Sequence, residues 1–191
     1  MRLSDTTLEV LRLGALLHDI GKIGISDHLL RKPAPLTPDE YEVIKKHPTV
    51  GSRILKNVRF LEPHLPIVEL HHERPDGGGY PLGLTGKRIP LLARIVHVAD
   101  AYDAMTSARA YRPALPASTG LAELHRCAGT DFDPDVVRAF ATVMARGDVP
   151  VVEAGSSLDA FAEEPAGGQP RASGPATPDA LDEFSSEVEA V

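Results

Sequence analysis

The amino-acid sequence predicts an all-α domain over residues 1–150, followed by a tail. Three observations support this fold class. Apolar residues recur every three to four positions in several segments, which is the period of an amphipathic helix. Helix-start signals, Thr37-Pro38 and Asp133-Pro134, precede two of these segments. The chain shows no alternation of strand-like and helix-like segments and no internal repeat.

The first predicted helix precedes a turn at Gly21, and one face of it carries Leu8, Leu11, Ala15 and His18. The second should begin at Thr37, an N-cap residue followed by a proline and by acids in the first turn. It should stop at Pro48, because a proline ring cannot continue a helix. Further helices are expected over residues 51–55 and 63–72.

Residues 73–89 are expected to form a loop, because they contain five glycines: Gly77, Gly78, Gly79, Gly83 and Gly86. Pro90 should open a long helix with an apolar face formed by Leu92, Ile95, Val96 and Ala99. Asp100 follows Val96 by one turn and should point inward, where a buried carboxylate needs a cation. Asp133 should begin the last helix, with a core face of Val137, Phe140, Ala141 and Met144.

Residues 151–191 are expected to form a disordered acidic tail, because their Ala, Gly, Pro, Ser and Glu cannot bury enough apolar surface to offset ordering. Residues 153–191 hold nine of the 27 acids and a single base, Arg171. The predicted domain is therefore nearly neutral and does not resemble a basic nucleic-acid surface. Thr177-Pro178 leaves open a short tail helix that docks on a partner, with apolar residues Leu181, Phe184 and Val188.

Composition favours a cytoplasmic protein that binds neither a membrane nor a nucleic acid polymer. No apolar run approaches the ~20 residues of a membrane span, and the start lacks the layout of a secretory signal. Cys127 is the single cysteine, which excludes an internal disulfide. We interpret Cys127 as a half-buried small hydrophobe.

The chain carries a set of metal-type ligands: His18, Asp19, His47, His71, His72 and Asp100. Imidazole and carboxylate together suit divalent Fe, Mn or Zn. If the helices bring these side chains together, they would complete a two-metal cage that clamps a phosphate ester. Any one of these histidines taken alone is more often a packed or solvent-exposed imidazole, so the sequence context decides between the two interpretations.

Four blocks in fixed order provide that context: LLHDIGKIGI at 16–25, KPAPLTPDEYEVIKKHPTVGSRIL at 32–55, HHERPDGGGYP at 71–81 and IPLLARIVHVADAYDAMTSARAYR at 89–112. Together they resemble the HD-GYP subgroup of the HD phosphohydrolase superfamily over roughly residues 11–145. The resemblance implies an HD-domain helical bundle that hydrolyses cyclic di-GMP to linear pGpG, GMP or both in bacterial second-messenger signalling. It also implies two or three divalent metal ions, with Fe or Mn favoured.

The resemblance implies a role for individual residues. Asp19 would bridge two metals and take part in catalysis, and the five other ligands would be His18, His47, His71, His72 and Asp100. Lys22, four residues after His18 and hence expected on the same helix face, resembles the catalytic lysine. The alternative for Lys22 is a solvated helix-end lysine.

Arg109 and Arg112 resemble a pair that binds the substrate phosphates, since guanidinium forks suit a dianionic dinucleotide; the alternative is surface charge. By the same resemblance, Gly79-Tyr80-Pro81 would form a recognition surface for substrate or for a signalling-protein partner. His97, three residues before Asp100, leaves open a supporting role behind the ligands.

One departure from the family is expected to matter. Family members carry a further helix with a histidine ligand before the His-Asp pair, and no histidine precedes His18 here. Glu9 cannot substitute, because nine helical residues place it roughly 13–14 Å away along the axis. A start that lies upstream, a non-hydrolysing relative, or a helix supplied by a second chain would each explain this. We expect the chain alone to hydrolyse cyclic di-GMP poorly or not at all, and its uncovered apolar surface to favour marginal stability or a homodimer.

Two further functions stay open at the level of sequence. The helical scaffold of this superfamily hosts several substrates, so the chain is also compatible with a phosphohydrolase that acts on another nucleotide. A catalytically inactive HD-GYP module that binds signalling partners through residues 73–89 is the alternative from outside the enzyme class.

Overall fold

The computed structural model describes residues 2–108 and 113–147. These residues form α1 (Asp5–Leu17), α2 (Asp27–Leu30), α3 (Pro38–Ile44), α4 (His47–Leu55), α5 (Leu65–Leu70), α6 (Leu91–Thr106), α7 (Ala117–Arg126) and α8 (Pro134–Arg146). Short 3-10 segments cover Ile20–Gly24, Arg59–His64 and Gly86–Arg88. Within the described ranges there is no β-strand, and a single bridge joins Ala128 to Phe132. The all-α fold class is confirmed.

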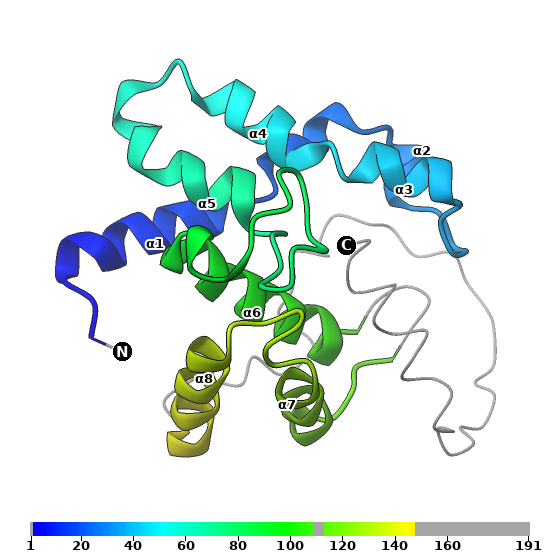
Figure 1. Cartoon of the computed structure of the whole chain (residues 1–191). Helices are drawn as coiled ribbons and strands as arrows, with labels where there is room; N and C mark the ends of the chain where they lie inside the picture. Colours follow the sequence, from blue (N-terminus) through cyan, green and yellow to red (C-terminus); the bar gives the residue numbers. More distant parts are fainter. Residues whose placement is uncertain (1, 109–112, 148–191) are drawn as a thin grey trace, which may run out of the picture.

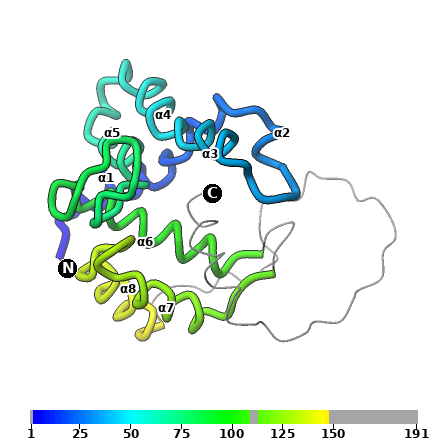
Figure 2. The backbone as a smooth tube through the Cα atoms, turned by 45° about the vertical axis from the view of Figure 1, so that its right-hand side comes forward, coloured from blue at the N-terminus to red at the C-terminus, as the bar shows by residue number. Residues whose placement is uncertain are grey.

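The helices form two groups that meet at α6. On one side, α4 packs on α5 and on the 3-10 segment Ile20–Gly24, while α1 packs on α5. On the other side, α7 and α8 pack on α6 and on each other, as Figures 1 and 2 show from two directions. Because α6 also packs on α5, this long helix contacts both groups.

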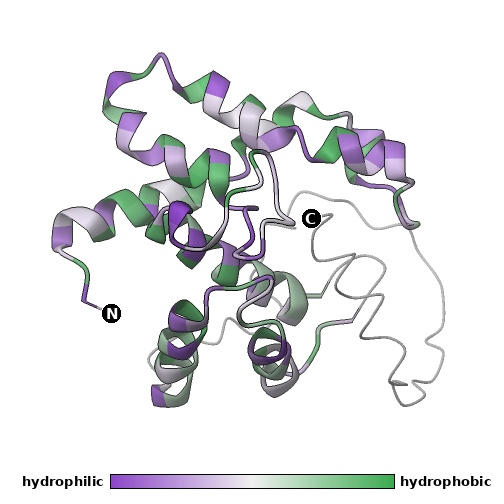
Figure 3. Cartoon of the chain, viewed as in Figure 1, coloured by the Kyte–Doolittle hydropathy of each residue, from purple (hydrophilic) through white to green (hydrophobic). Residues whose placement is uncertain are grey.

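Each group has its own apolar core. The α6–α8 core includes Val98, Met105, Leu124 and Val137, while the α1–α5 core centres on Leu55, Leu61 and Val68. Apolar and polar residues alternate along the helices (Figure 3), and every described helix except α2 has at least one buried residue. No helix in the described ranges is both long enough and apolar enough to cross a membrane.

Helix boundaries differ from the sequence-based expectation in the N-terminal half. The helix α1 ends at Leu17 rather than at Gly21, and a 3-10 segment follows it. The prediction that Pro48 ends a helix is wrong, because α3 already ends at Ile44 and Pro48 lies in the first turn of α4. A proline is tolerated there because the amide it lacks would have no intrahelical partner.

The predicted start of α3 is confirmed by its cap. The Thr37 hydroxyl accepts a hydrogen bond from the Glu40 amide at 3.3 Å, and the Glu40 carboxylate accepts one from the Thr37 amide at 2.7 Å. This reciprocal pair satisfies two amides that a helix leaves without backbone partners.

The other departures concern single segments. The helix expected over 63–72 is divided into the 3-10 segment Arg59–His64 and α5. On α6, Ala99 is exposed, and Ala93 and Val98 are buried in its place. The predicted tail, 151–191, lies outside the described residues, so its disorder stays a prediction.

Candidate metal centre

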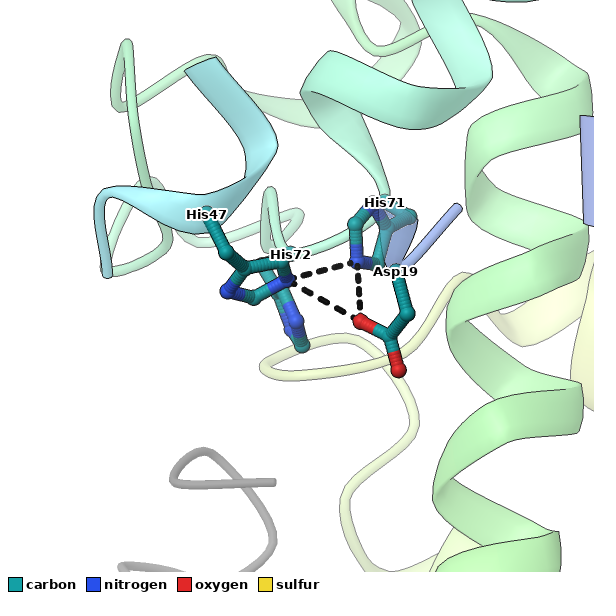
Figure 4. Close-up of side chains that lie close together, drawn as sticks. All are labelled: Asp19, His47, His71 and His72. Carbon is teal, nitrogen blue, oxygen red and sulfur yellow. Dashed lines mark hydrogen bonds and ion pairs between the residues drawn. The ribbon is translucent and has the colours of Figure 1, made fainter. Parts of the chain in front are cut away.

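Three chain reversals deliver the ligand-type side chains to one place. His18 caps the end of α1 and Asp19 follows it directly, His47 is the first residue of α4, and His71 and His72 follow the end of α5. These residues lie at or just beyond helix ends, so their side chains can point into the space between neighbouring helices. Figure 4 shows Asp19, His47, His71 and His72 converging from these separate segments.

Asp19 lies at the centre of the cluster. One donor atom from each of Asp19, His47, His71 and His72 lies within 4.8 Å of every other. The Asp19 Oδ1 atom is 3.2 Å from His47 Nε2 and 3.9 Å from His71 Nε2, and these two nitrogens are 3.3 Å apart (Figure 4). Such spacing lets one ion contact all four donors after a small inward movement.

The second carboxylate oxygen of Asp19 faces a different set of groups. Asp19 Oδ2 is 3.3 Å from His18 Nε2 and 2.9 Å from Lys22 Nζ. His18 Nε2 is also 3.6 Å from Asp100 Oδ1, so α6 contributes to this side of the site. The two oxygens of Asp19 therefore address two neighbouring donor sets, one formed by His47, His71 and His72 and the other by His18 and Asp100.

Backbone carbonyls select the tautomer of three histidines. The Nδ1 atoms of His18, His47 and His71 lie 2.6, 2.9 and 2.9 Å from the carbonyl oxygens of Ala15, Ile44 and Val68. A carbonyl oxygen can only accept, so each Nδ1 carries the proton. When such a ring is neutral, its unprotonated Nε2 atom is left facing Asp19, which is the orientation that a metal-binding imidazole requires.

Burial and charge prepare the cluster for a cation. Burial, together with the nearby His18 and His47, lowers the pKa of His71 to about 3, and burial lowers the pKa of His72 well below its ordinary value. Both rings are therefore neutral near pH 7 and able to donate lone pairs. Burial alone would raise the pKa of Asp19, but the nearby His18 and His47 rings and the Lys22 ammonium group hold it well below its usual range.

The two carboxylates beside His18 favour a positive charge at this position. Burial alone would lower its pKa, but Asp100 and Asp19 outweigh this and raise the pKa to about 10. His18 Nε2 nevertheless lies beyond good hydrogen-bonding geometry, and His18 Nε2, Asp19 Oδ1 and His72 Nε2 are buried without a hydrogen-bond partner in the described residues. Such unmade bonds are costly, and divalent cations between these atoms would satisfy all three.

Lys22 reaches the site by a route different from the predicted one. Because α1 ends at Leu17, His18 and Lys22 do not share an α-helical face, and that part of the prediction is wrong. Lys22 lies instead in the 3-10 segment, and its ammonium group donates to Asp19 Oδ2 at 2.9 Å. The charge of Lys22 is therefore beside the cluster, with the side chain 21% exposed.

The other residues considered in the sequence analysis lie either outside the described residues or outside the cluster. Arg109 and Arg112 lie outside the described residues. Glu9 is exposed and pairs with Arg12 at 2.8 Å, so it stays away from the cluster as expected. No imidazole or carboxylate from the described residues 2–17 belongs to the cluster. The centroid of the His97 ring lies 5.1 Å from that of Phe132 and 6.2 Å from that of His72, so His97 lies between the cluster and the α6–α8 core.

Sequence reasoning missed Glu73, which follows the two histidines directly. Glu73 is 1% exposed, and its carboxylate oxygens accept hydrogen bonds from the amides of Leu82 and Leu84 at 2.6 and 2.7 Å. The HHE sequence contained the only available signal, a charged residue next to two candidate ligands. The partners of Glu73 are backbone amides nine and eleven positions away, which no residue pattern reveals.

Gly21 controls how closely the His-Asp segment approaches α4. A Cβ atom at Gly21 would lie 1.8 Å from the His47 carbonyl oxygen and 2.6 Å from the Gly51 amide nitrogen. We expect Gly21→Ala to push α4 away from Asp19, destabilise the domain by about 1–3 kcal/mol or more, and weaken metal binding. Urea denaturation and metal titration would measure the two effects.

Gly24→Ala is the matched control, because its Cβ would meet a Val50 methyl at 3.1 Å and no backbone atom within 4 Å. We expect this variant to keep both properties close to those of the wild type. Equal behaviour of the two alanine variants would contradict the close-approach role of Gly21.

Comparison with known proteins gives a family match. A family model for the HD domain matches residues 1–136. A cyclic di-GMP phosphodiesterase of Thermotoga maritima is 44% identical over 142 residues, which cover 73% of this chain and 39% of that protein. The cyclic di-GMP phosphodiesterase response regulator RpfG of Xanthomonas campestris is 47% identical over 139 residues, covering 72% of this chain and 37% of that protein.

A solved structure has the same fold. Bd1817, an HD-G"Y"P protein from Bdellovibrio bacteriovorus, superposes with a TM-score of 0.60 at 24% identity, covering 74% of this chain and 45% of that one. The chain spans less than two fifths of the length of the two curated relatives. The family match, the Gly79-Tyr80-Pro81 loop and the histidine-aspartate cluster lead to one conclusion: this chain belongs to the HD domain family, in its HD-GYP subgroup.

Proposed function

We propose that this chain is a metal-dependent phosphodiesterase that hydrolyses cyclic di-GMP to linear pGpG, GMP or both in bacterial signalling. The observation that carries the proposal is the convergence of the Asp19 carboxylate with three imidazoles within 4.8 Å. The names of the two curated relatives supply the substrate. The neutral imidazoles of His71 and His72, together with the ionised carboxylate of Asp19, suit divalent Fe or Mn.

Asp19, His47, His71 and His72 would hold one ion, and Asp19, His18 and Asp100 would hold a second. Divalent ions there would supply positive charge for the phosphate oxygens and make a water molecule acidic enough to react at neutral pH. Lys22 is close enough to Asp19 to place its ammonium group beside the departing oxygen, where it would stabilise negative charge or donate a proton.

The hydrolysis experiment uses the full chain with Mn²⁺ or Fe²⁺ and cyclic di-GMP, and chromatography separates pGpG and GMP from the substrate. We expect slow turnover that a chelator and Asp19→Ala both abolish. Slow rather than fast turnover is expected because no ligand from described residues 2–17 joins the cluster. Fast, metal-dependent turnover would contradict the prediction that a ligand is missing.

The same experiment decides between the proposal and its alternatives. The exposed Leu82, at 64%, favours as second candidate an inactive module that binds signalling proteins at the Gly79-Tyr80-Pro81 loop. Binding of cyclic di-GMP without any turnover would support that module. Faster hydrolysis of a different nucleotide would instead assign the chain to another substrate.

The homodimer expected from the sequence stays a prediction, which light scattering would test.

Arg109 and Arg112 are proposed to bind the substrate phosphates. We expect Arg112→Ala to weaken binding of a non-hydrolysable cyclic di-GMP analogue about 10-fold or more, since a charge-assisted hydrogen bond contributes about 1.5–3 kcal/mol. Metal content should stay unchanged. Calorimetric titration measures the affinity, and Arg138→Ala, an exposed arginine that pairs with Asp135, is the control. Unchanged affinity in the Arg109→Ala, Arg112→Ala double variant would refute the assignment.

A further inference from the structure

His72 is held differently from the other histidines of the cluster. The rings of His18, His47 and His71 are each oriented by a hydrogen bond to the carbonyl three residues earlier. Among the described residues His72 shows no such bond, and its Nε2 atom is buried without a hydrogen-bond partner. Some other contact must therefore keep this ring pointed into the cluster.

Tyr80 supplies that contact. Its ring stacks on the His72 ring with centroids 4.8 Å apart and an interplanar angle of 22°. The edge of Tyr41 on α3 meets Tyr80 with centroids 6.4 Å apart, and the Lys45 ammonium group lies 6.0 Å from the Tyr80 ring centroid. Tyr80 is thus enclosed between α3 and His72, so its face limits rotation of the His72 ring.

Glu73 anchors the loop that carries Tyr80. A carboxylate that is 1% exposed needs strong donors, and here both oxygens are satisfied by loop amides, those of Leu82 and Leu84. The Tyr80 amide also donates to the His72 carbonyl at 3.2 Å. A Cβ atom at Gly79 would lie 2.4 Å from the Arg74 amide nitrogen, so the loop crosses directly over the backbone of residues 72–74.

We propose that Glu73 is a positioning residue, which fixes the 80–84 segment so that the Tyr80 ring holds His72 in its metal-binding orientation. This inference rests on the proposed function only in assuming that the cluster binds a metal. The Gly79-Tyr80-Pro81 loop thereby acts as part of the metal centre, in addition to any recognition role. Glu73 acts through Tyr80 and contacts neither metal nor substrate itself.

The test is titration of the metal-free full-length chain with Co²⁺ alone, followed by visible absorption, which depends on the number and geometry of the Co²⁺ ligands. We expect Glu73→Gln and Tyr80→Ala each to weaken Co²⁺ binding about 10-fold or more and to alter the absorption bands. The physical reason is that His72 becomes free to rotate away. Tyr80→Phe retains the stacking face and should keep both the affinity and the spectrum.

Glu69→Gln is the matched control, because Glu69 lies one turn earlier on α5 and bonds to the Ser52 hydroxyl at 3.3 Å, away from the loop. Wild-type Co²⁺ binding by folded Glu73→Gln, or by Tyr80→Ala, would overturn the proposal. Loss of affinity in Tyr80→Phe would do the same, since the hydroxyl rather than the ring face would then matter. If Glu73→Gln fails to fold, the two Tyr80 variants decide the question.

This experiment is independent of turnover. A wild-type chain that binds Co²⁺ with the expected dependence on Glu73 and Tyr80, yet leaves cyclic di-GMP intact, would refute the proposed function and support the positioning role. Turnover of cyclic di-GMP together with unchanged Co²⁺ binding in Tyr80→Ala would support the proposed function and refute the positioning role.

Discussion

Replacing Asp19 with alanine is expected to remove most of the Fe or Mn that the purified chain retains. Both carboxylate oxygens of Asp19 are engaged, Oδ1 toward His47 and His71 and Oδ2 toward His18. The variant therefore loses an anionic donor from both donor sets at once. Loss of a supporting hydrogen bond already costs about 10–100-fold in metal affinity, so loss of this central ligand should exceed that range.

Elemental analysis after gel filtration measures the metal per chain. Asp103→Ala is the control, because Asp103 lies on the same helix as Asp100 but is exposed and accepts a hydrogen bond from Ser107. Its metal content should match that of the wild type. Equal metal in the wild type and in Asp19→Ala would rule out a central role for this carboxylate.

The second large effect is expected at Asp133, which is not one of the candidate ligands. This carboxylate is 5% exposed, forms an ion pair with the buried guanidinium of Arg94, and accepts hydrogen bonds from the amides of Asp135 and Val136 at the start of α8. Removing one partner of a buried ion pair leaves an uncompensated charge, which costs about 3–5 kcal/mol. Loss of the helix cap adds about 0.5–2 kcal/mol.

Urea denaturation of Asp133→Ala should therefore show a free energy of unfolding lower by several kcal/mol. Asp133→Asn separates the two causes, since asparagine caps a helix as well as aspartate does but cannot neutralise Arg94. Asp135→Ala is the surface control: Asp135 is 55% exposed and pairs with Lys87 and Arg138, so its loss should cost below about 1 kcal/mol. Similar midpoints for Asp133→Ala and Asp135→Ala would contradict the assignment.

The pH dependence of this contribution follows from the pKa of Asp133. Burial alone would raise that pKa, but the hydrogen bond from Arg94 and the two helix amides hold it below its ordinary value. The unfolded chain therefore binds a proton at a higher pH than the folded chain. The stabilisation is complete above the ordinary carboxyl pKa and is lost as the pH falls through the lowered value.

Local sequence predicted the starts of α3 and α8 and the identity of the candidate ligands. The cap at Thr37, the start of α8 at Asp133 and the apolar spacing on α8 act within one or two turns, so a short pattern predicts them. The same holds for the ligand types, since imidazole and carboxylate chemistry does not depend on the fold. The resemblance then allowed the cluster to be predicted before its geometry was known.

Tertiary structure decided the points that depend on contacts between distant segments. The end of α1 at Leu17 places Lys22 on a 3-10 segment, and the close approach of Gly21 to α4 sets the position of His47. Glu73 is buried only because amides nine and eleven residues later turn back toward it. Burial and hydrogen-bond partners of this kind depend on chain reversals, whose energies come from the packed domain as a whole and are not encoded in any one segment.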